Sequence, residues 1–191
     1  MSLVKRFLIV LGITLIAMPT LAASAEKQRE KILETRSEVL KRLYEEKPQA
    51  RAEISDAEGY AVFSNLGVNL FFIAAGGGRG VVHDNKSGKD TFMNMGSAGV
   101  GIGLGIKDFR GIFIFHTRKA LTDFIDRGWD FTGQADAAAK STDKGGEENV
   151  AGTTINGVTL YQLTETGLAL QATLQGTKYW KSNKLNQSRS Q

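Results

Sequence analysis

The sequence of 191 residues contains no cysteine, two prolines and two histidines. Without cysteine the chain can form neither a disulfide nor a thiolate metal site, and cysteine-based catalysis is excluded. The hydrophobic fraction of 41% is ordinary and the 22 glycines show no three-residue period, which excludes collagen-like and disordered classes. A chain of this length is expected to form one domain that buries its own core.

The chain also lacks the motifs of hydrolases and nucleotide-binding proteins. Met95 stands where the first glycine of a nucleophile elbow would precede Ser97. The glycines of residues 76–80 and 99–105 match neither the dinucleotide-binding pattern nor the phosphate-binding loop. Neither run is followed by a clear helix start, so a phosphate site at a helix N-terminus is not expected there.

Metal sites have equally little support in the sequence. Residues 84–90 form a polar hairpin loop without the alternating acidic positions of a calcium loop. His83 and His116 lie far apart in apolar strand segments, and a histidine pair without a third ligand is a weak metal signal. We therefore predict no catalytic residues, no metal and no cofactor.

Residues 1–25 are typical of an export signal. Lys5 and Arg6 precede an apolar run over residues 7–18, and small residues at 23–25 provide a cleavage site. The run is shorter than the roughly 20 residues that a membrane-spanning helix needs. The sequence therefore predicts a periplasmic or secreted protein, and peripheral contact with the outer membrane is compatible with either location.

The net charge of +4 is too weak to predict nucleic-acid binding. Removal of the export signal would leave 22 basic and 20 acidic residues, which weakens the positive field further.

The rest of the chain divides into three segments. Residues 26–56 are predicted to be helical, with an apolar stripe over 26–47 that carries Arg36 near its middle. Residues 57–180 are predicted to be rich in strands, and residues 181–191 form a polar, loose tail. We expect an α+β fold with a curved or closed, barrel-like, mainly antiparallel sheet of about eight strands, a long N-terminal helix and one or two short helices.

Two features could serve a membrane surface. The segment Lys178-Tyr-Trp-Lys181 places aromatic side chains between lysines, and cations near an anionic bilayer contribute about 1 kcal/mol each. Its alternative is a basic tail that stays in solution. Arg36 could likewise reach a lipid interface or lie at the edge of the core, and the nearly neutral helix favours the core.

Five short motifs occur together along the chain: Gly59-Tyr-Ala-Val-Phe63, Gly77-Gly-Arg-Gly-Val81, the glycine alternation of 96–105, Gly128-Trp-Asp-Phe-Thr-Gly133 and Gly176-Thr-Lys-Tyr179. Together they resemble the SYLF domain family, whose bacterial members are secreted single domains related to the actin-binding SYLF proteins of yeast. The resemblance implies binding to phospholipids, phosphoinositides in eukaryotes, with an amphipathic N-terminal helix taking part. Actin is not expected as a partner, because it is absent from a bacterial envelope.

The first hypothesis is therefore a non-enzymatic, exported protein that binds anionic phospholipid or phosphoinositide headgroups at a membrane surface. The alternative is an integral or tightly associated outer-membrane β-barrel or structural envelope protein, and an enzyme of unknown reaction is the third. The candidate lipid-binding residues are Arg36, Phe71, Phe72, Lys178, Trp180 and Lys181.

Overall fold

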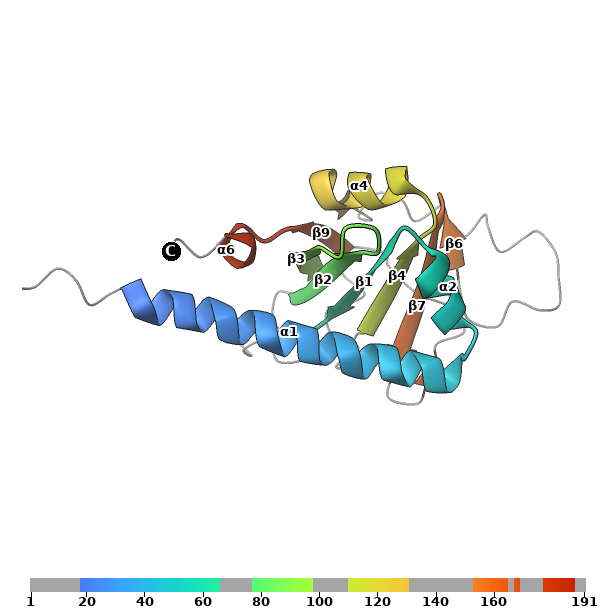
Figure 1. Cartoon of the computed structure of the whole chain (residues 1–191), viewed down its shortest axis with the longest axis horizontal. Coiled ribbons are helices and arrows are strands. Elements are labelled where there is room, and N and C mark those ends of the chain that lie inside the picture. Colours follow the sequence, from blue (N-terminus) through green and yellow to red (C-terminus); the bar gives the residue numbers. More distant parts are fainter. Residues whose placement is uncertain are drawn as a thin grey trace, which may run out of the picture.

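A long helix lies across one face of an antiparallel sheet, and a shorter helix covers the other face (Figure 1). The computed structural model describes residues 18–65, 77–97, 110–130, 153–164, 167–168 and 177–187. The apolar run at 68–75, which contains Phe71 and Phe72, lies outside the described residues, as do the alternating glycines of 99–105.

The described elements follow one another in this order: α1 (Met18–Glu46), α2 (Ala50–Asp56), β1 (Gly59–Ser64), β2 (Gly78–Asp84), β3 (Asp90–Ser97), β4 (Arg110–Phe115), α4 (Arg118–Arg127), β5 (Trp129–Asp130), β6 (Thr153–Ile155), β7 (Val158–Thr164), β8 (Gly167–Leu168), β9 (Thr177–Lys181) and α6 (Asn183–Asn186).

The strands form one sheet in the order β5-β9-β3-β2-β1-β4-β7-β6, with β8 also paired to β7. Every pairing is antiparallel. The predicted α+β fold with an antiparallel sheet is confirmed. Within the part of the chain that the structure describes, β5 and β6 end the sheet without meeting, so of the two predicted forms, curved or closed, the closed form is wrong.

The core on the α4 side is aromatic. Phe63, Phe113, Phe124 and Tyr179 are buried, and the Phe63 and Tyr179 ring centroids lie 4.7 Å apart at an edge-to-face angle of 70°. Such pairs add about 0.5–1.5 kcal/mol each beyond the burial of their area. Because Phe124 belongs to α4, this cluster fixes the short helix on the sheet.

The core on the other face is aliphatic. Val39 and Leu43 of α1 pack against Val62, Ile112 and Ile114 of the sheet. The apolar stripe of α1 therefore faces the protein, which confirms that it packs in the core. The helix begins at Met18, earlier than the predicted residue 26, and ends at Glu46 shortly before Pro48, whose ring cannot continue it. Among the described residues, no helix has a stretch long and apolar enough to cross a membrane.

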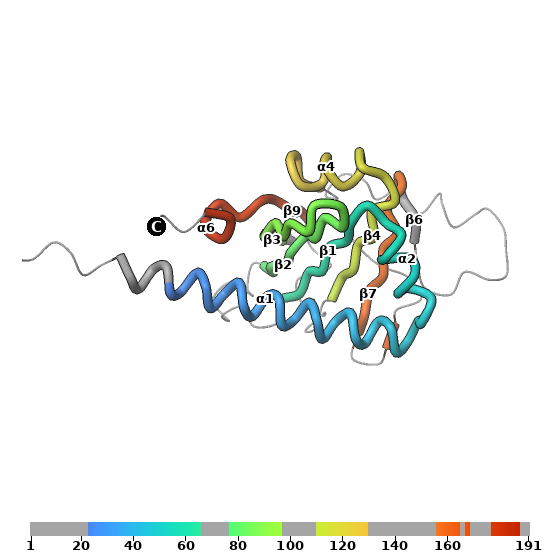
Figure 2. The backbone as a smooth tube through the Cα atoms, in the orientation of Figure 1, coloured from blue at the N-terminus to red at the C-terminus, as the bar shows by residue number. Residues whose placement is uncertain are grey.

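The prediction of a loose tail is wrong for residues 181–187. Lys181 is the last residue of β9, and α6 buries Leu185 to 2% exposure beside the N-terminal half of α1 (Figure 2). Arg29 of α1 donates from Nε to the Leu185 carbonyl at 2.8 Å and from Nη2 to the Gln187 carbonyl at 2.8 Å. These bonds satisfy carbonyl groups at the end of a helix that is too short to satisfy them itself.

Candidate functional site

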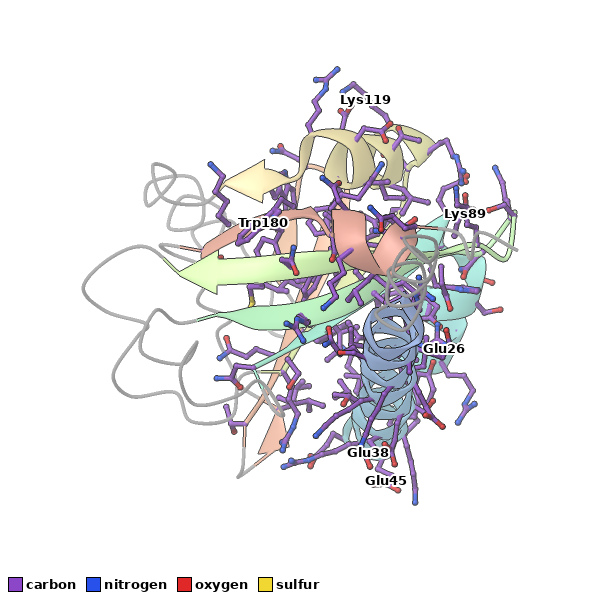
Figure 3. The ribbon with its side chains drawn as sticks, turned by 90° about the vertical axis from the view of Figure 1, so that its left-hand side faces the viewer. Glu26, Glu38, Glu45, Lys89, Lys119 and Trp180 are labelled. Carbon is purple, nitrogen blue, oxygen red and sulfur yellow. The ribbon has the colours of Figure 1, made fainter. Side chains whose placement is uncertain are left out.

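Strand β9 presents two different faces because side chains alternate along a strand. Thr177 and Tyr179 are buried on the α4 side, whereas Lys178 and Trp180 are exposed on the opposite side. Trp180 is 43% exposed. Among the described residues, it is the one large hydrophobic side chain that is exposed to solvent. Figure 3 shows it well away from the C-terminal half of α1.

A glycine on the neighbouring strand makes room for the indole. Gly96 of β3 lies opposite Lys178 in the register, two pairs along from the Asn94–Trp180 pair and therefore on the same face of the sheet. A Cβ at Gly96 would lie 3.0 Å from Cη2 of Trp180, closer than ordinary contacts allow. The Trp180 ring therefore rests on bare backbone at this point of the sheet.

A hollow of about 330 Å³ lies beside Trp180. Its wall combines side chains from α1, three strands and the segment that follows β9. The lining residues that matter for its chemistry are Gln28, Arg79, Asn94, Trp180, Lys181 and Lys184. All the charged side chains among the described residues that line it are cationic, so the hollow carries a positive potential.

The polar groups of this hollow come from one row across the sheet. Arg79 of β2 pairs with Asn94 of β3, and Asn94 pairs with Trp180 of β9. Neighbouring strands are about 4.8 Å apart, so these three side chains are adjacent on one face. Within the described part of the chain, Arg79, Asn94 and Lys184 form no side-chain hydrogen bond and no ion pair. Their donors are therefore available to a ligand.

A second hollow, of about 480 Å³, lies beside α4 and α6. It differs from the first in charge. Its cations Arg29, Lys89 and Lys181 are matched by Asp84, Asp90 and Asp126. Three acids opposite three bases leave no net charge, so this hollow is the poorer site for an anion despite its larger volume.

The structure brings together only part of the predicted site. Lys178 and Trp180 share one face of β9, but Lys181 contacts the α4 side, where its Nζ lies 3.3 Å from Asp126 Oδ1. Phe71 and Phe72 are outside the described residues.

Arg36 lies elsewhere, between α1 and the β2–β3 hairpin. Its Nη1 donates to Asp90 Oδ1 at 3.0 Å, and the Arg36 side chain is only 19% exposed. Nδ1 of His83 lies 2.7 Å from the same carboxylate oxygen. Arg36 therefore belongs to a partly buried ionic cluster, and its role as a lipid contact remains a prediction.

His116 belongs to a separate polar cluster. Its Nε2 lies 2.8 Å from Thr159 Oγ1 and 3.5 Å from Glu53 Oε1, and Tyr161 donates to Glu53 Oε2 at 2.7 Å. Burial and the Glu53 carboxylate raise the pKa of Tyr161, so its hydroxyl stays protonated. Within the described ranges, no three histidine, aspartate or glutamate side chains are grouped to hold a metal.

Sequence reasoning missed Arg79 and Asn94. Arg79 lies in the glycine run of residues 76–80 and Asn94 in an ordinary strand-like segment, and only the register of β2 and β3 with β9 places them beside Trp180. Lys184 belongs to the basic C-terminal segment that the sequence singled out, but its place in the hollow depends on the unpredicted helix α6.

Comparison with protein-family models finds no match for the chain. Over 141 residues the chain is 33% identical to Beta cell expansion factor A of Aeromonas veronii. The similar region covers 73% of this chain and 51% of that protein, so the chain spans about half the length of this relative.

Proposed function

We propose that the protein is a non-enzymatic, exported lipid-binding protein of the SYLF type that associates with anionic phospholipid headgroups at a membrane surface. The observation that carries the proposal is the exposed Trp180, which lies on one face of β9 with Lys178 and next to the cationic hollow. An indole favours the interface between headgroups and acyl chains, and nearby cations are attracted to anionic lipid.

The proposed contact uses the sheet face near β9 and does not need the apolar stripe of α1. Val39 and Leu43 of that stripe are buried against the sheet, so inserting them into lipid would require the helix to leave its core. Exposing a buried Val or Leu side chain costs about 1.5–3 kcal/mol. Binding through β9 leaves these contacts intact.

Co-sedimentation with vesicles tests the proposal. Wild-type protein is expected to bind vesicles of phosphatidylcholine with phosphatidylglycerol, and to bind vesicles of phosphatidylcholine alone much less. Replacing Lys178 and Lys181 by glutamate should weaken binding to the anionic vesicles by at least about tenfold, since each charge near the surface contributes about 1 kcal/mol. Trp180→Ala should weaken binding to the same vesicles.

A matched control replaces two lysines that lie away from β9 by glutamate, so that the total change in charge is the same. Lys89 and Lys119 are exposed and lie on the β2–β3 hairpin and α4 (Figure 3). Replacing both by glutamate should leave binding above half of the wild-type level. Equal binding to neutral and anionic vesicles, or equal losses in the two double variants, would contradict the proposal.

Export is tested separately, by mass measurement of protein recovered from outside the cytoplasm. Cleavage after the small residues 23–25 predicts a mature chain that begins at Glu26. Recovery of the unprocessed chain from the cytoplasm alone would contradict this part of the proposal.

A further inference from the structure

The hollow beside Trp180 is lined by three cationic side chains and by no acidic side chain among the described residues. Arg79 is partly buried on the sheet, yet its guanidinium has no ion pair or hydrogen bond among the described residues. Lys184 is likewise uncommitted, whereas Lys181, which also borders the hollow, is paired with Asp126. Placing like charges around one concave space is unfavourable unless a counter-ion fills it.

The donor set indicates which anion fits. The guanidinium of Arg79 offers a planar fork of N–H groups, Lys184 offers a point charge, and Asn94 offers a neutral amide donor. A phosphomonoester has three terminal oxygens and up to two negative charges, so it can engage all three side chains at once. A phosphodiester has two terminal oxygens and only one negative charge, so it would balance the cations of the hollow less completely.

We infer that this hollow is a binding site for a phosphomonoester, held by Arg79, Asn94 and Lys184, with Trp180 packing against the group that carries the phosphate. The inference rests on the proposed function where the phosphate belongs to a lipid headgroup. A free phosphomonoester presents the same chemistry, and the experiment separates these two sources.

The two hollows differ in whether acidic side chains face their cations. The larger hollow has three aspartates opposite its three cations, and Lys181 borders both spaces. In the smaller hollow the corresponding acids are missing among the described lining residues. A phosphate would therefore be neutralised in the smaller hollow and repelled by carboxylates in the larger one.

Titration with glycerol 3-phosphate, followed by calorimetry, tests the site without a membrane. Saturable one-to-one binding is expected for the full chain, with much weaker binding of dimethyl phosphate, a diester. Arg79→Gln and Lys184→Gln should each weaken glycerol 3-phosphate binding by roughly tenfold or more, the usual effect of losing a charge-assisted hydrogen bond. Lys89→Gln removes an exposed cation outside the hollow and should leave affinity within about twofold of the wild type.

Vesicle binding is the second part of the experiment. Vesicles containing phosphatidic acid, a phosphomonoester lipid, are compared with phosphatidylglycerol vesicles adjusted to the same surface charge. A preference for phosphatidic acid that Arg79→Gln abolishes supports the site with a lipid ligand. Loss of glycerol 3-phosphate binding in that variant, with vesicle binding unchanged, supports the site with a free phosphomonoester as its ligand.

Other outcomes overturn the inference. One is vesicle binding with no phosphatidic acid preference and no binding of glycerol 3-phosphate, which leaves the proposed function standing. Another is glycerol 3-phosphate binding that neither variant weakens. Conversely, the absence of binding to any vesicle, with glycerol 3-phosphate binding intact, contradicts the proposed function alone. Lys184 is exposed on α6, so Lys184→Gln tests the site even where Arg79→Gln disturbs the sheet.

Discussion

Arg36 donates from a single nitrogen, Nη1, to both carboxylate oxygens of Asp90, at 3.0 Å and 3.1 Å. The two residues are 54 positions apart in the sequence, and their side chains are 19% and 27% exposed. The pair links α1 to the start of β3 at the point where a charge interrupts the apolar stripe of the helix. A charge on that stripe is tolerated because a partner of opposite sign meets it there.

Replacing Arg36 by alanine should lower the free energy of unfolding by about 1–3 kcal/mol, because Asp90 would remain partly buried without its cation. Urea denaturation measures this loss. Lys41→Ala, on the exposed side of α1, is the control and should change stability by less than about 0.5 kcal/mol. Vesicle binding should be unchanged in Lys41→Ala. Wild-type stability combined with weakened vesicle binding in Arg36→Ala would instead identify Arg36 as a headgroup contact.

Asp84 should contribute stability at neutral pH that disappears in acid. Hydrogen bonds from Arg118, and from the backbone of Ser87 and Lys86, hold the pKa of its carboxyl well below the usual range. A lowered native pKa stabilises the fold above the unfolded value of about 3.9, and this contribution is lost as pH falls below it. Asp84→Asn should therefore cost roughly 2 kcal/mol at pH 7 and clearly less at pH 3.

Urea denaturation at the two pH values checks this prediction. Asp56→Asn, at an exposed carboxyl, is the control and should show little effect at either pH. An Asp84→Asn deficit that is the same at pH 3 and pH 7 would show that the carboxylate charge does not stabilise the fold.

Local signals predicted much of the fold. Apolar spacing over residues 26–47 predicted the packed stripe of α1, which ends at Glu46. The polar loop with Gly88 predicted the β2–β3 hairpin, and Gly88 has the expected positive φ of +67°. Each of these features depends on residues close together in the chain.

Features that depend on distant pairings were not predictable. The adjacency of Arg79, Asn94 and Trp180 requires the register of three strands, and the last of them is about 85 residues from β3. Helix α6 was missed because its composition is polar. It is held in place by the buried Leu185 side chain and by hydrogen bonds between the Asn186 side chain and the backbone of β3. Sequence patterns do not record such contacts.

Gly128 should be among the least replaceable glycines of the described residues. It ends α4 at φ +72°, and a Cβ there would lie 2.1 Å from the Tyr179 carbonyl oxygen. Alanine would combine left-handed strain with a backbone clash, and we expect a loss of roughly 3 kcal/mol in chemical denaturation. Gly88 has nearly the same φ with nothing within 4 Å of its Cβ position, so Gly88→Ala should cost only about 1 kcal/mol. Equal losses in the two variants would show that the carbonyl contact is unimportant.

Asn186 takes the place of a strand at the edge of β3. Strand β9 pairs with β3 only over Met93–Ser97, so Phe92 lies just beyond the ladder. The Phe92 N–H donates to Asn186 Oδ1 at 2.8 Å, and Asn186 Nδ2 donates to the Phe92 carbonyl at 2.7 Å. The Phe92 carbonyl also accepts from the Ser182 backbone N–H at 3.0 Å, whereas the Asn186 side chain provides the acceptor for the Phe92 N–H.

Asn186→Ala should therefore accelerate hydrogen exchange at the Phe92 amide by about tenfold or more, because that N–H loses its acceptor at an exposed edge. The free energy of unfolding should fall by about 1–2 kcal/mol, since each hydrogen bond that the Asn186 side chain makes contributes about 0.5–1.5 kcal/mol. Asn183→Ala, at an exposed position of the same helix, should alter neither measurement. Unchanged exchange at Phe92 in Asn186→Ala would mean that the packing of Leu185 alone holds α6 against the sheet.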